Sequence, residues 1–266
     1  MIVFSHGNSF PASTYSVLLD SLRERGFDVR AIEKFGHNPR FPVTDNWTHI
    51  EEELSEFVQE QVAQHQGRPV WLVGHSLGGI LSIMSAARHP ALVRGVVMLD
   101  SPILGGWKST AMGVAKNFPA LGRFSPGAVS RKRRNSWPDT DAVMEHFRHK
   151  RAFAKWDEQV LRDYAAYGTQ EVDGKRVLSF DREVETRFYN TIPDHLPAYL
   201  RRHALKCPVT FIGGSHSVER RQVGMDMVER VTKGRTMMLD GSHLFPMEKP
   251  LATAAAVEAA LRNMGA

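Results

Sequence analysis

Cysteine is nearly absent from this sequence, and long apolar runs are missing altogether. Cys207 is the one cysteine in 266 residues, so an internal disulfide is impossible, and one thiol does not make a metal site. No stretch approaches the roughly 18 consecutive apolar residues of a membrane-spanning helix. The apolar run at residues 1–4 is too short for a secretory signal and lacks its basic start. We therefore expect a cytoplasmic protein with no membrane partner.

The sequence also lacks the motifs that usually hold cofactors or nucleic acids. It has no phosphate-binding loop, no dinucleotide fingerprint and no cluster of metal ligands, so we expect neither a cofactor nor a metal. Basic residues outnumber acidic ones by 34 to 29, and part of the excess lies in one run at residues 131–134. No alternating aromatic residues or nucleic-acid motif accompany this run, which favours a solvated turn over a site for nucleic acid or another anion. The oligomeric state is not indicated.

Short apolar runs alternate with amphipathic stretches, which is typical of a parallel sheet covered by helices. With 42% hydrophobic residues, the chain is long enough for one large domain with a sizeable core. The predicted strands are residues 2–5, 29–32, 70–73, 95–99, 209–212 and 236–239. Helical spacing of apolar residues predicts helices over residues 13–25, 47–64 and 251–264. The fold class is therefore α/β, with a mostly parallel central sheet of about six strands flanked by helices.

The alternation stops in the middle third of the chain. From about residue 102 to 205 the sequence is rich in aromatic and charged residues, with helical periodicity over residues 139–167. Strand and helix signals resume near Cys207. We predict a core made of residues 1–101 and 206–266, into which residues 102–205 are inserted as a helical cap or lid.

The strongest chemical signal lies between a predicted buried strand and an apolar helix. There, residues 74–78 read Gly-His-Ser-Leu-Gly, a match to the pattern Gly-x-Ser-x-Gly. A nucleophile on a tight strand-to-helix turn needs small neighbours, because the backbone is strained and the serine must protrude. The helix that follows would direct its first N–H groups and its positive dipole end toward the serine. The pattern alone is common, but its context favours Ser76 as a nucleophile.

With these motifs the chain resembles the α/β-hydrolase superfamily over nearly its whole length. The segment Phe-Ser-His-Gly-Asn-Ser at residues 4–9 resembles the family's oxyanion loop, and Gly-Ser-His at residues 241–243 resembles the loop of its catalytic histidine. The family's order of serine, acid and histidine along the chain is kept. One departure is that this chain begins on the family's third strand, so the resemblance implies a core that lacks the first two strands.

The resemblance implies a role for several positions. Ser76 corresponds to the nucleophile, and His243 to the general base that takes the serine proton and returns it to the leaving group. The backbone N–H groups of Leu77 and Asn8 would form the oxyanion hole. The Asn8 side chain would either face the pocket or hold its own loop, and the sequence does not decide between the two.

The acid of the triad is less simply assigned. The family usually places it after the penultimate strand, where this chain has Ser217, and a serine cannot stabilise an imidazolium by charge. Some members place it after the strand that follows the nucleophile, and here that strand ends in Asp100, although Asp-Ser-Pro also suits a structural turn. We assign Asp100, with Glu219 as second choice and Asp240 as third. His216 and Ser217 are candidates for the pocket lining.

The resemblance implies a cofactor-independent hydrolase that cleaves a small-molecule carboxylic ester or thioester through an acyl-enzyme on Ser76. C–C bond hydrolysis, perhydrolysis, acyl transfer and cyanohydrin lysis can use the same triad, and the fold does not choose among them. A non-catalytic ligand-binding protein is the alternative from another class, because a serine stands at position 217. An acyl-coenzyme A substrate is a further alternative, its phosphates meeting the basic residues 131–134.

Overall fold

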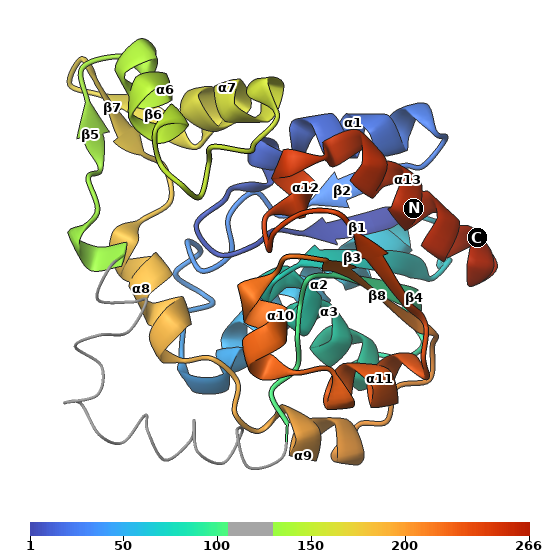
Figure 1. Ribbon diagram of the computed structural model, residues 1–266. Helices are drawn as coiled ribbons and strands as arrows, with labels where there is room; N and C mark the ends of the chain where they lie inside the picture. Colours follow the sequence, from blue (N-terminus) through green and yellow to red (C-terminus); the bar gives the residue numbers. More distant parts are fainter. Residues whose placement is uncertain (106–129) are drawn as a thin grey trace.

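The centre of the protein is a six-stranded sheet in which all neighbouring strands are parallel (Figure 1). The structure is a computed structural model that describes residues 1–105 and 130–266. The strand order is β2-β1-β3-β4-β8-β9. The strands are β1 (Ile2–Ser5), β2 (Val29–Ala31), β3 (Val70–His75), β4 (Val93–Leu99), β8 (Val209–Gly214) and β9 (Thr236–Leu239). The predicted fold class is confirmed, and β3, β4 and β8 are slightly longer than predicted.

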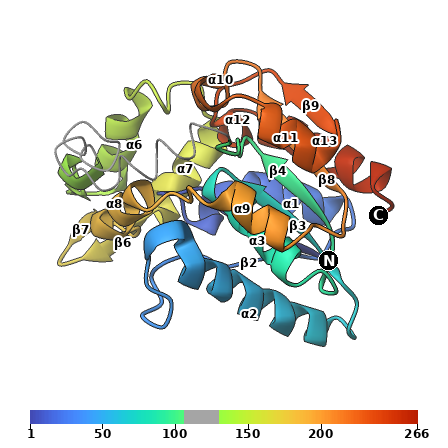
Figure 2. The ribbon, with the colours of Figure 1, turned by 90° about the horizontal axis from the view of Figure 1, so that it is seen from below.

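Helices cover both faces of this sheet (Figure 2). Two of them, α1 and α13, pack on one face, while α2 and α3 pack on the other. Their bounds are α1 (Ser16–Glu24), α2 (Thr48–Gln64), α3 (Leu77–Arg88) and α13 (Pro250–Asn263). Successive side chains of a strand point to opposite faces, so Phe4 packs with α1 and α13 while its neighbour Val3 packs with α2 and α3. Every residue of β1 and β3 is buried, as expected for a sheet covered on both sides.

Short helices complete the core. They are the 3-10 turns η1 (Ala12–Tyr15) and η2 (Asp45–Trp47) and the helices α10 (Val218–Val223), α11 (Asp226–Thr232) and α12 (Phe245–Glu248). The helix predicted over residues 13–25 is thus a 3-10 turn that continues into α1. No helix within residues 1–105 and 130–266 is both long and apolar enough to cross a lipid bilayer.

The chain between β4 and β8 forms a second group of elements, which we call the insertion. Its described elements are β5 (Ser136–Trp137), α6 (Thr140–Arg148), α7 (Glu158–Tyr167), β6 (Thr169–Val172), β7 (Lys175–Leu178), α8 (Arg182–Asn190) and α9 (Leu196–Arg202). Its elements β5, α6, α7, β6 and β7 lie to one side of the sheet, at the upper left of Figure 1, and α9 lies at the bottom of that view. Part of the predicted cap, residues 106–129, lies outside the described residues.

The insertion is not purely helical, which corrects the sequence-based expectation. Its strands form a three-stranded antiparallel sheet in the order β5-β7-β6. The hairpin between β6 and β7 turns at Asp173 and Gly174, whose φ angles are 50° and 69°. An Asp-Gly pair favours this type I′ geometry, so the sequence did contain a hairpin signal. The helical region predicted over residues 139–167 is also divided, into α6 and α7, whose first turns are capped by Asp139 and Asp157.

Aromatic residues join the insertion to the core. Trp137, Phe147 and Tyr164 are buried in the same hydrophobic cluster as Phe4 and Tyr15 beneath α1. Such rings bury large apolar areas. The insertion and the sheet therefore share one apolar interior.

Candidate active site

Ser76 lies at the sharp turn between β3 and α3. Its backbone has φ 52° and ψ −115°, a conformation of the kind that costs a non-glycine residue about 1–3 kcal/mol. A Cβ atom on Gly78 would lie 2.0 Å from the carbonyl oxygen of Ser5. Only glycine fits at that position, which is the physical reason for the second glycine of the Gly-x-Ser-x-Gly pattern.

Ser76, His243 and Asp100 form a continuous hydrogen-bonded chain. The Oγ of Ser76 lies 3.0 Å from Nε2 of His243, and Nδ1 of His243 lies 2.6 Å from Oδ2 of Asp100. An ionised carboxylate only accepts hydrogen bonds, so Nδ1–H donates to Asp100 and Nε2 accepts from the serine hydroxyl. The three side chains follow β3, β4 and β9, and the ends of these parallel strands meet at one edge of the sheet. This geometry can activate a serine hydroxyl.

The Asp100 carboxylate is completely buried and accepts hydrogen bonds on both of its oxygens. Its Oδ1 accepts from the Gly214 N–H at 2.7 Å, and its Oδ2 accepts from the Ser217 hydroxyl at 2.6 Å. Burial acts to raise the pKa of Asp100, but its hydrogen bonds, the one from His243 first, outweigh burial and lower the pKa. The carboxylate therefore stays ionised. Ser217 is itself completely buried, and its hydroxyl contacts the Asp100 carboxylate.

A second carboxylate, Glu219, lies close to the same histidine. Burial disfavours the charged form of His243, but the hydrogen bond and charge of Asp100, followed by the charge of Glu219, outweigh burial and raise the pKa of His243. Polar atoms of Asp100, Glu219 and His243 lie within 4.8 Å of one another, the one group among the described residues that could supply three metal ligands. Because His243 and Asp100 already share a hydrogen bond, a metal ion would have to displace that bond.

His216 and Asp240 pair with each other at the surface. The Nε2 of His216 lies 3.1 Å from Oδ1 of Asp240, and the two side chains are 64% and 70% exposed. Asp240 also pairs with Lys249. His216 is therefore mostly exposed and pairs at the surface, its place in a pocket lining stays a prediction, and the contacts of Asp240 do not include His243.

The loop after β1 runs beside the turn that carries Ser76. β1 and β3 pair so that Ser5 lies opposite Gly74, which places residues 6–9 next to that turn. Within the part of the chain that the structure describes, the N–H groups of Asn8 and Leu77 donate no backbone or side-chain hydrogen bond. They are available to stabilise an oxyanion. The side-chain amide of Asn8 donates to the Glu185 carbonyl oxygen at 3.2 Å, so this side chain holds its loop.

Behind these loops is a buried hydrogen-bond chain that sequence reasoning missed. The Gly7 N–H donates to the Tyr15 hydroxyl at 3.0 Å, that hydroxyl lies 2.7 Å from Nδ1 of His75, and Nε2 of His75 lies 2.9 Å from the His243 carbonyl oxygen. A carbonyl oxygen only accepts, so His75 carries its proton on Nε2. Burial lowers the pKa of His75 to about 3 and keeps the ring neutral. Tyr15 fits the apolar pattern of its helix and gave no polar signal.

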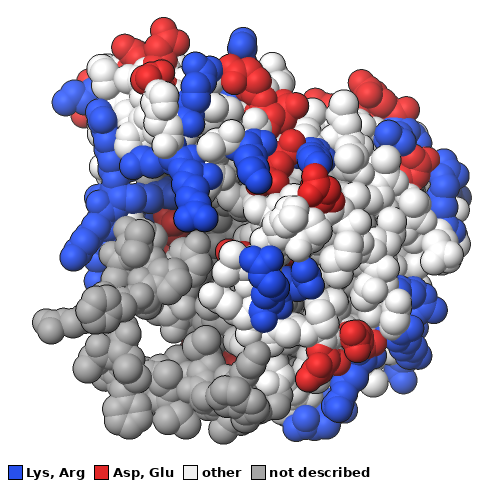
Figure 3. Space-filling view, viewed as in Figure 1, with Lys and Arg blue, Asp and Glu red and all other residues white. Residues whose placement is uncertain are grey.

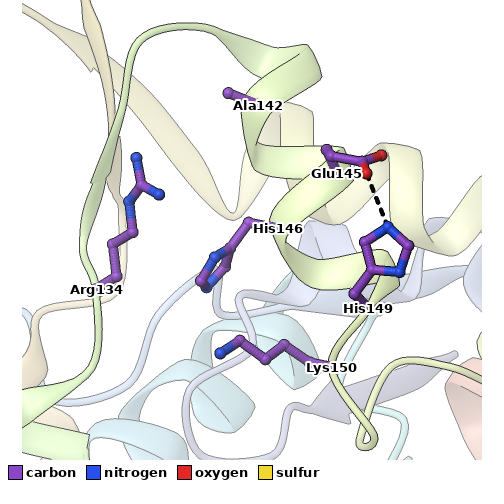
Figure 4. Close-up of a pocket in the computed structure, with 6 residues that line it drawn as sticks. All are labelled: Arg134, Ala142, Glu145, His146, His149 and Lys150. Carbon is purple, nitrogen blue, oxygen red and sulfur yellow. Dashed lines mark hydrogen bonds and ion pairs between the residues drawn. The ribbon is translucent and has the colours of Figure 1, made fainter.

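A surface hollow of about 480 Å³ lies within the insertion and is distinct from the serine chain (Figure 4). Its lining residues are Arg134, Ala142, Glu145, His146, His149 and Lys150. His149 pairs with Glu145 at 2.7 Å. Lys150 stands just beyond the C-terminal end of α6, where a cation complements the helix dipole. Burial, followed by the charges of Lys150 and Arg134, lowers the pKa of His146.

Two residues of the basic run at positions 131–134 pair with glutamates. Arg131 contacts Glu183 at 3.1 Å, and Arg133 contacts Glu185 at 3.2 Å. Lysine and arginine side chains gather on the insertion, at the upper left of Figure 3. The Arg133 side chain, however, is only 22% exposed. The prediction of a solvated turn is therefore wrong for Arg133, and two of the four cations already face carboxylates.

Comparisons with known proteins agree with this architecture. The chain belongs to the alpha/beta hydrolase family, which it matches over residues 2–256. It is 24% identical over 173 residues to a monoglyceride lipase homolog of Monkeypox virus, covering 61% of this chain and 62% of that protein. It is 29% identical over 113 residues to the monoglyceride lipase of Homo sapiens, covering 41% of this chain and 37% of that protein. The chain thus spans less than two thirds of the length of these relatives.

A solved structure extends the likeness to nearly the whole fold. The crystal structure of E-2-(acetamidomethylene)succinate hydrolase superposes with a TM-score of 0.75 and 21% identity, covering 98% of this chain and 91% of that one. At this identity the likeness shows the fold alone, because one fold supports many chemistries.

Proposed function

We propose that the protein is a serine hydrolase that cleaves a carboxylic ester or thioester through an acyl-enzyme on Ser76. The observation that carries this proposal is the hydrogen-bonded chain from Ser76 through His243 to Asp100, with distances of 3.0 and 2.6 Å. The similarity to proteins named as monoglyceride lipases supports an ester as the substrate.

In the first half of the proposed reaction, Nε2 of His243 takes the hydroxyl proton while Oγ of Ser76 attacks the acyl carbon. Negative charge develops on the former carbonyl oxygen, and the N–H groups of Asn8 and Leu77 stabilise it. The imidazolium then gives its proton to the departing alcohol or thiol, which leaves an ester on Ser76. Asp100 stabilises the imidazolium and holds its tautomer throughout.

The second half of the reaction repeats these steps with water as the nucleophile. His243 takes a proton from water, the hydroxide attacks the ester on Ser76, and the same N–H groups receive the oxyanion. Collapse of the intermediate returns the proton to Oγ and releases the acid. Besides the substrate and one water molecule, the proposed cycle uses side chains and backbone groups of this chain.

We also propose that residues 1–101 and 206–266 form the catalytic core and that residues 102–205 form a cap that selects the substrate. The alternative of a non-catalytic binding protein was motivated by the serine at position 217. Because the Ser217 hydroxyl donates to Asp100 at 2.6 Å, the serine at this position does not argue against catalysis. An acyl-coenzyme A substrate is likewise disfavoured, because Arg131 and Arg133 already face glutamates.

The proposal is tested with a panel of nitrophenyl esters, acyl thioesters and vinylogous diketones, assayed with the wild-type protein and with Ser76→Ala. We expect turnover of esters or thioesters, a loss of about 10⁴-fold or more in Ser76→Ala, and covalent labelling by a fluorophosphonate in the wild type only. Turnover of the diketones alone would redirect the proposal to C–C bond hydrolysis. Labelling and turnover that survive Ser76→Ala would overturn it.

The identity of the acid has its own test, the substitution Asp100→Asn. The amide keeps the size of the side chain but cannot stabilise the imidazolium, so we expect kcat to fall about 10⁴-fold. Circular dichroism and thermal unfolding check that the fold persists. A loss of less than tenfold, together with a large loss in Glu219→Gln, would transfer the role to Glu219.

A further inference from the structure

The loop that carries the Asn8 N–H is attached to the insertion through one residue of α8. The Ser9 hydroxyl donates to Oε1 of Glu185 at 2.6 Å, and the Asn8 side-chain amide donates to the Glu185 carbonyl oxygen at 3.2 Å. Both Ser9 and Glu185 are at most 4% exposed. A side chain from the insertion and its own carbonyl therefore hold two consecutive residues of a core loop.

Ser9 adopts a backbone conformation that needs such support. Its φ is 79°, in the left-handed region that non-glycine residues occupy at a cost of about 1–3 kcal/mol. A strained conformation of this kind persists only where its surroundings fix it. The short hydrogen bond to Glu185 supplies that constraint directly beside the Asn8 N–H.

Glu185 is itself fixed in place. Its Oε2 lies 3.2 Å from Nε of Arg133, and the two side chains are 5% and 22% exposed. The Arg133 carbonyl oxygen in turn accepts a hydrogen bond at 2.8 Å from Arg182, which stands on the same helix as Glu185. Burial raises the pKa of Glu185, and the charge of Arg133 acts against that rise. The basic run thus includes one arginine with a structural partner in the interior.

We propose that Glu185 is a positioning residue that holds the Asn8 N–H in place for the oxyanion, so that the insertion contributes to the chemistry of the core site. This inference rests on the proposed function. Loss of the Ser9–Glu185 contact leaves Ser76, His243 and Asp100 untouched but lets the loop relax. Because a small misplacement of a catalytic group can cost about 100-fold in rate, the effect is expected in kcat rather than in substrate binding.

The test compares Ser9→Ala, Glu185→Gln and the double variant in the nitrophenyl ester assay. Each single variant is expected to lower kcat about 10- to 100-fold, with KM changed less than threefold. The affinity for a boronic acid that forms a tetrahedral adduct on Ser76 should fall in parallel with kcat. If the two residues act through one contact, the double variant will be no slower than the slower single variant. Independent, multiplying effects would contradict the proposal.

Controls separate this role from general stability. Glu183→Gln removes the neighbouring pair with Arg131, which lies at the surface of the same helix, and should leave kcat unchanged. Ser9→Gly removes the hydroxyl but relieves the φ strain, so it reports on the contact even if Glu185→Gln does not fold. If Ser9→Ala and Ser9→Gly both keep wild-type kcat and boronate affinity while Ser76→Ala is inactive, this inference fails and the proposed function stands. If Ser76→Ala is active, the proposed function itself has failed.

Discussion

At the scale of single residues, the site depends on how one carboxylate is surrounded. Asp100 is buried yet keeps a lowered pKa, because donors from β8 and from the loop after it reach both of its oxygens. Ser217 supplies one of those donors. A serine at the position where the family often has its acid is therefore compatible with an ionised carboxylate at Asp100, which follows the neighbouring strand β4.

Glu219 provides a prediction at this scale, because its charge helps to raise the pKa of His243. Only neutral His243 can act as a base, so activity should rise with pH as this histidine loses its proton. In Glu219→Gln the pKa of His243 falls, and the acid limb of the profile of kcat/KM against pH should move to lower pH. Glu229→Gln on α11, an exposed residue, is the control. A limb that stays in place or moves to higher pH would contradict the prediction.

At the scale of secondary-structure elements, three loops must keep their relative positions for the chemistry to work. The hydrogen-bond chain through Tyr15 and His75 joins the loop after β1, the turn between β3 and α3 and the backbone of His243. All of its members except His243 are buried. Hydrogen bonds in so dry an environment are costly to leave unmade, so this chain fixes where the loops lie.

Tyr15→Phe tests this arrangement, since it removes one hydroxyl and little else. The Gly7 N–H and Nδ1 of His75 lose their partner, which should cost about 1–3 kcal/mol in the free energy of unfolding. We expect kcat to fall about tenfold while KM changes little.

The matched control is Tyr199→Phe. The Tyr199 hydroxyl donates to the Met84 carbonyl oxygen at 3.2 Å, in the second half of α3 rather than at its first turn beside Ser76. This variant should lose stability but keep its kcat. Equal losses of kcat in both variants would show that the effect of Tyr15→Phe comes from general destabilisation.

At the scale of the whole molecule, the insertion and the sheet are parts of one packed structure. Trp137 and Trp156 of the insertion lie in the same apolar cluster as Trp71 of the sheet. Hydrogen bonds between α8 and the loop after β1 then link the insertion to the core. Elements that share a core usually unfold together.

We therefore predict one cooperative unfolding transition in guanidinium chloride. Tryptophan fluorescence, which reports on both parts, and far-ultraviolet circular dichroism should give the same midpoint, because the shared cluster must open as a unit. The loss of esterase activity should follow the same curve. An early fluorescence transition that precedes the loss of the sheet would show that the insertion unfolds separately.

The sequence by itself determined the elements of the central sheet and the local structure of the turn at Ser76. Short continuous apolar runs indicate the strands of the sheet, because each strand has two faces to bury, and a glycine is needed at position 78 because a Cβ would meet the Ser5 carbonyl. The Asp-Gly hairpin of the insertion was also legible, since the φ preferences of two adjacent residues are a local property. The hairpin was nevertheless not predicted, because the helical periodicity over residues 139–167 dominated the interpretation of this part of the chain.

Only the tertiary structure decided which distant residues meet. Asp100, Glu219 and Asp240 were all candidates for the acid, and the structure brings Asp100 within 2.6 Å of His243 although 143 positions separate them in the chain. The contacts of Tyr15 with His75 and of Ser9 with Glu185 arose in the same way. The physical reason is that strand order, sheet register and the packing of the insertion set these distances, and none of them is encoded within a short segment of sequence.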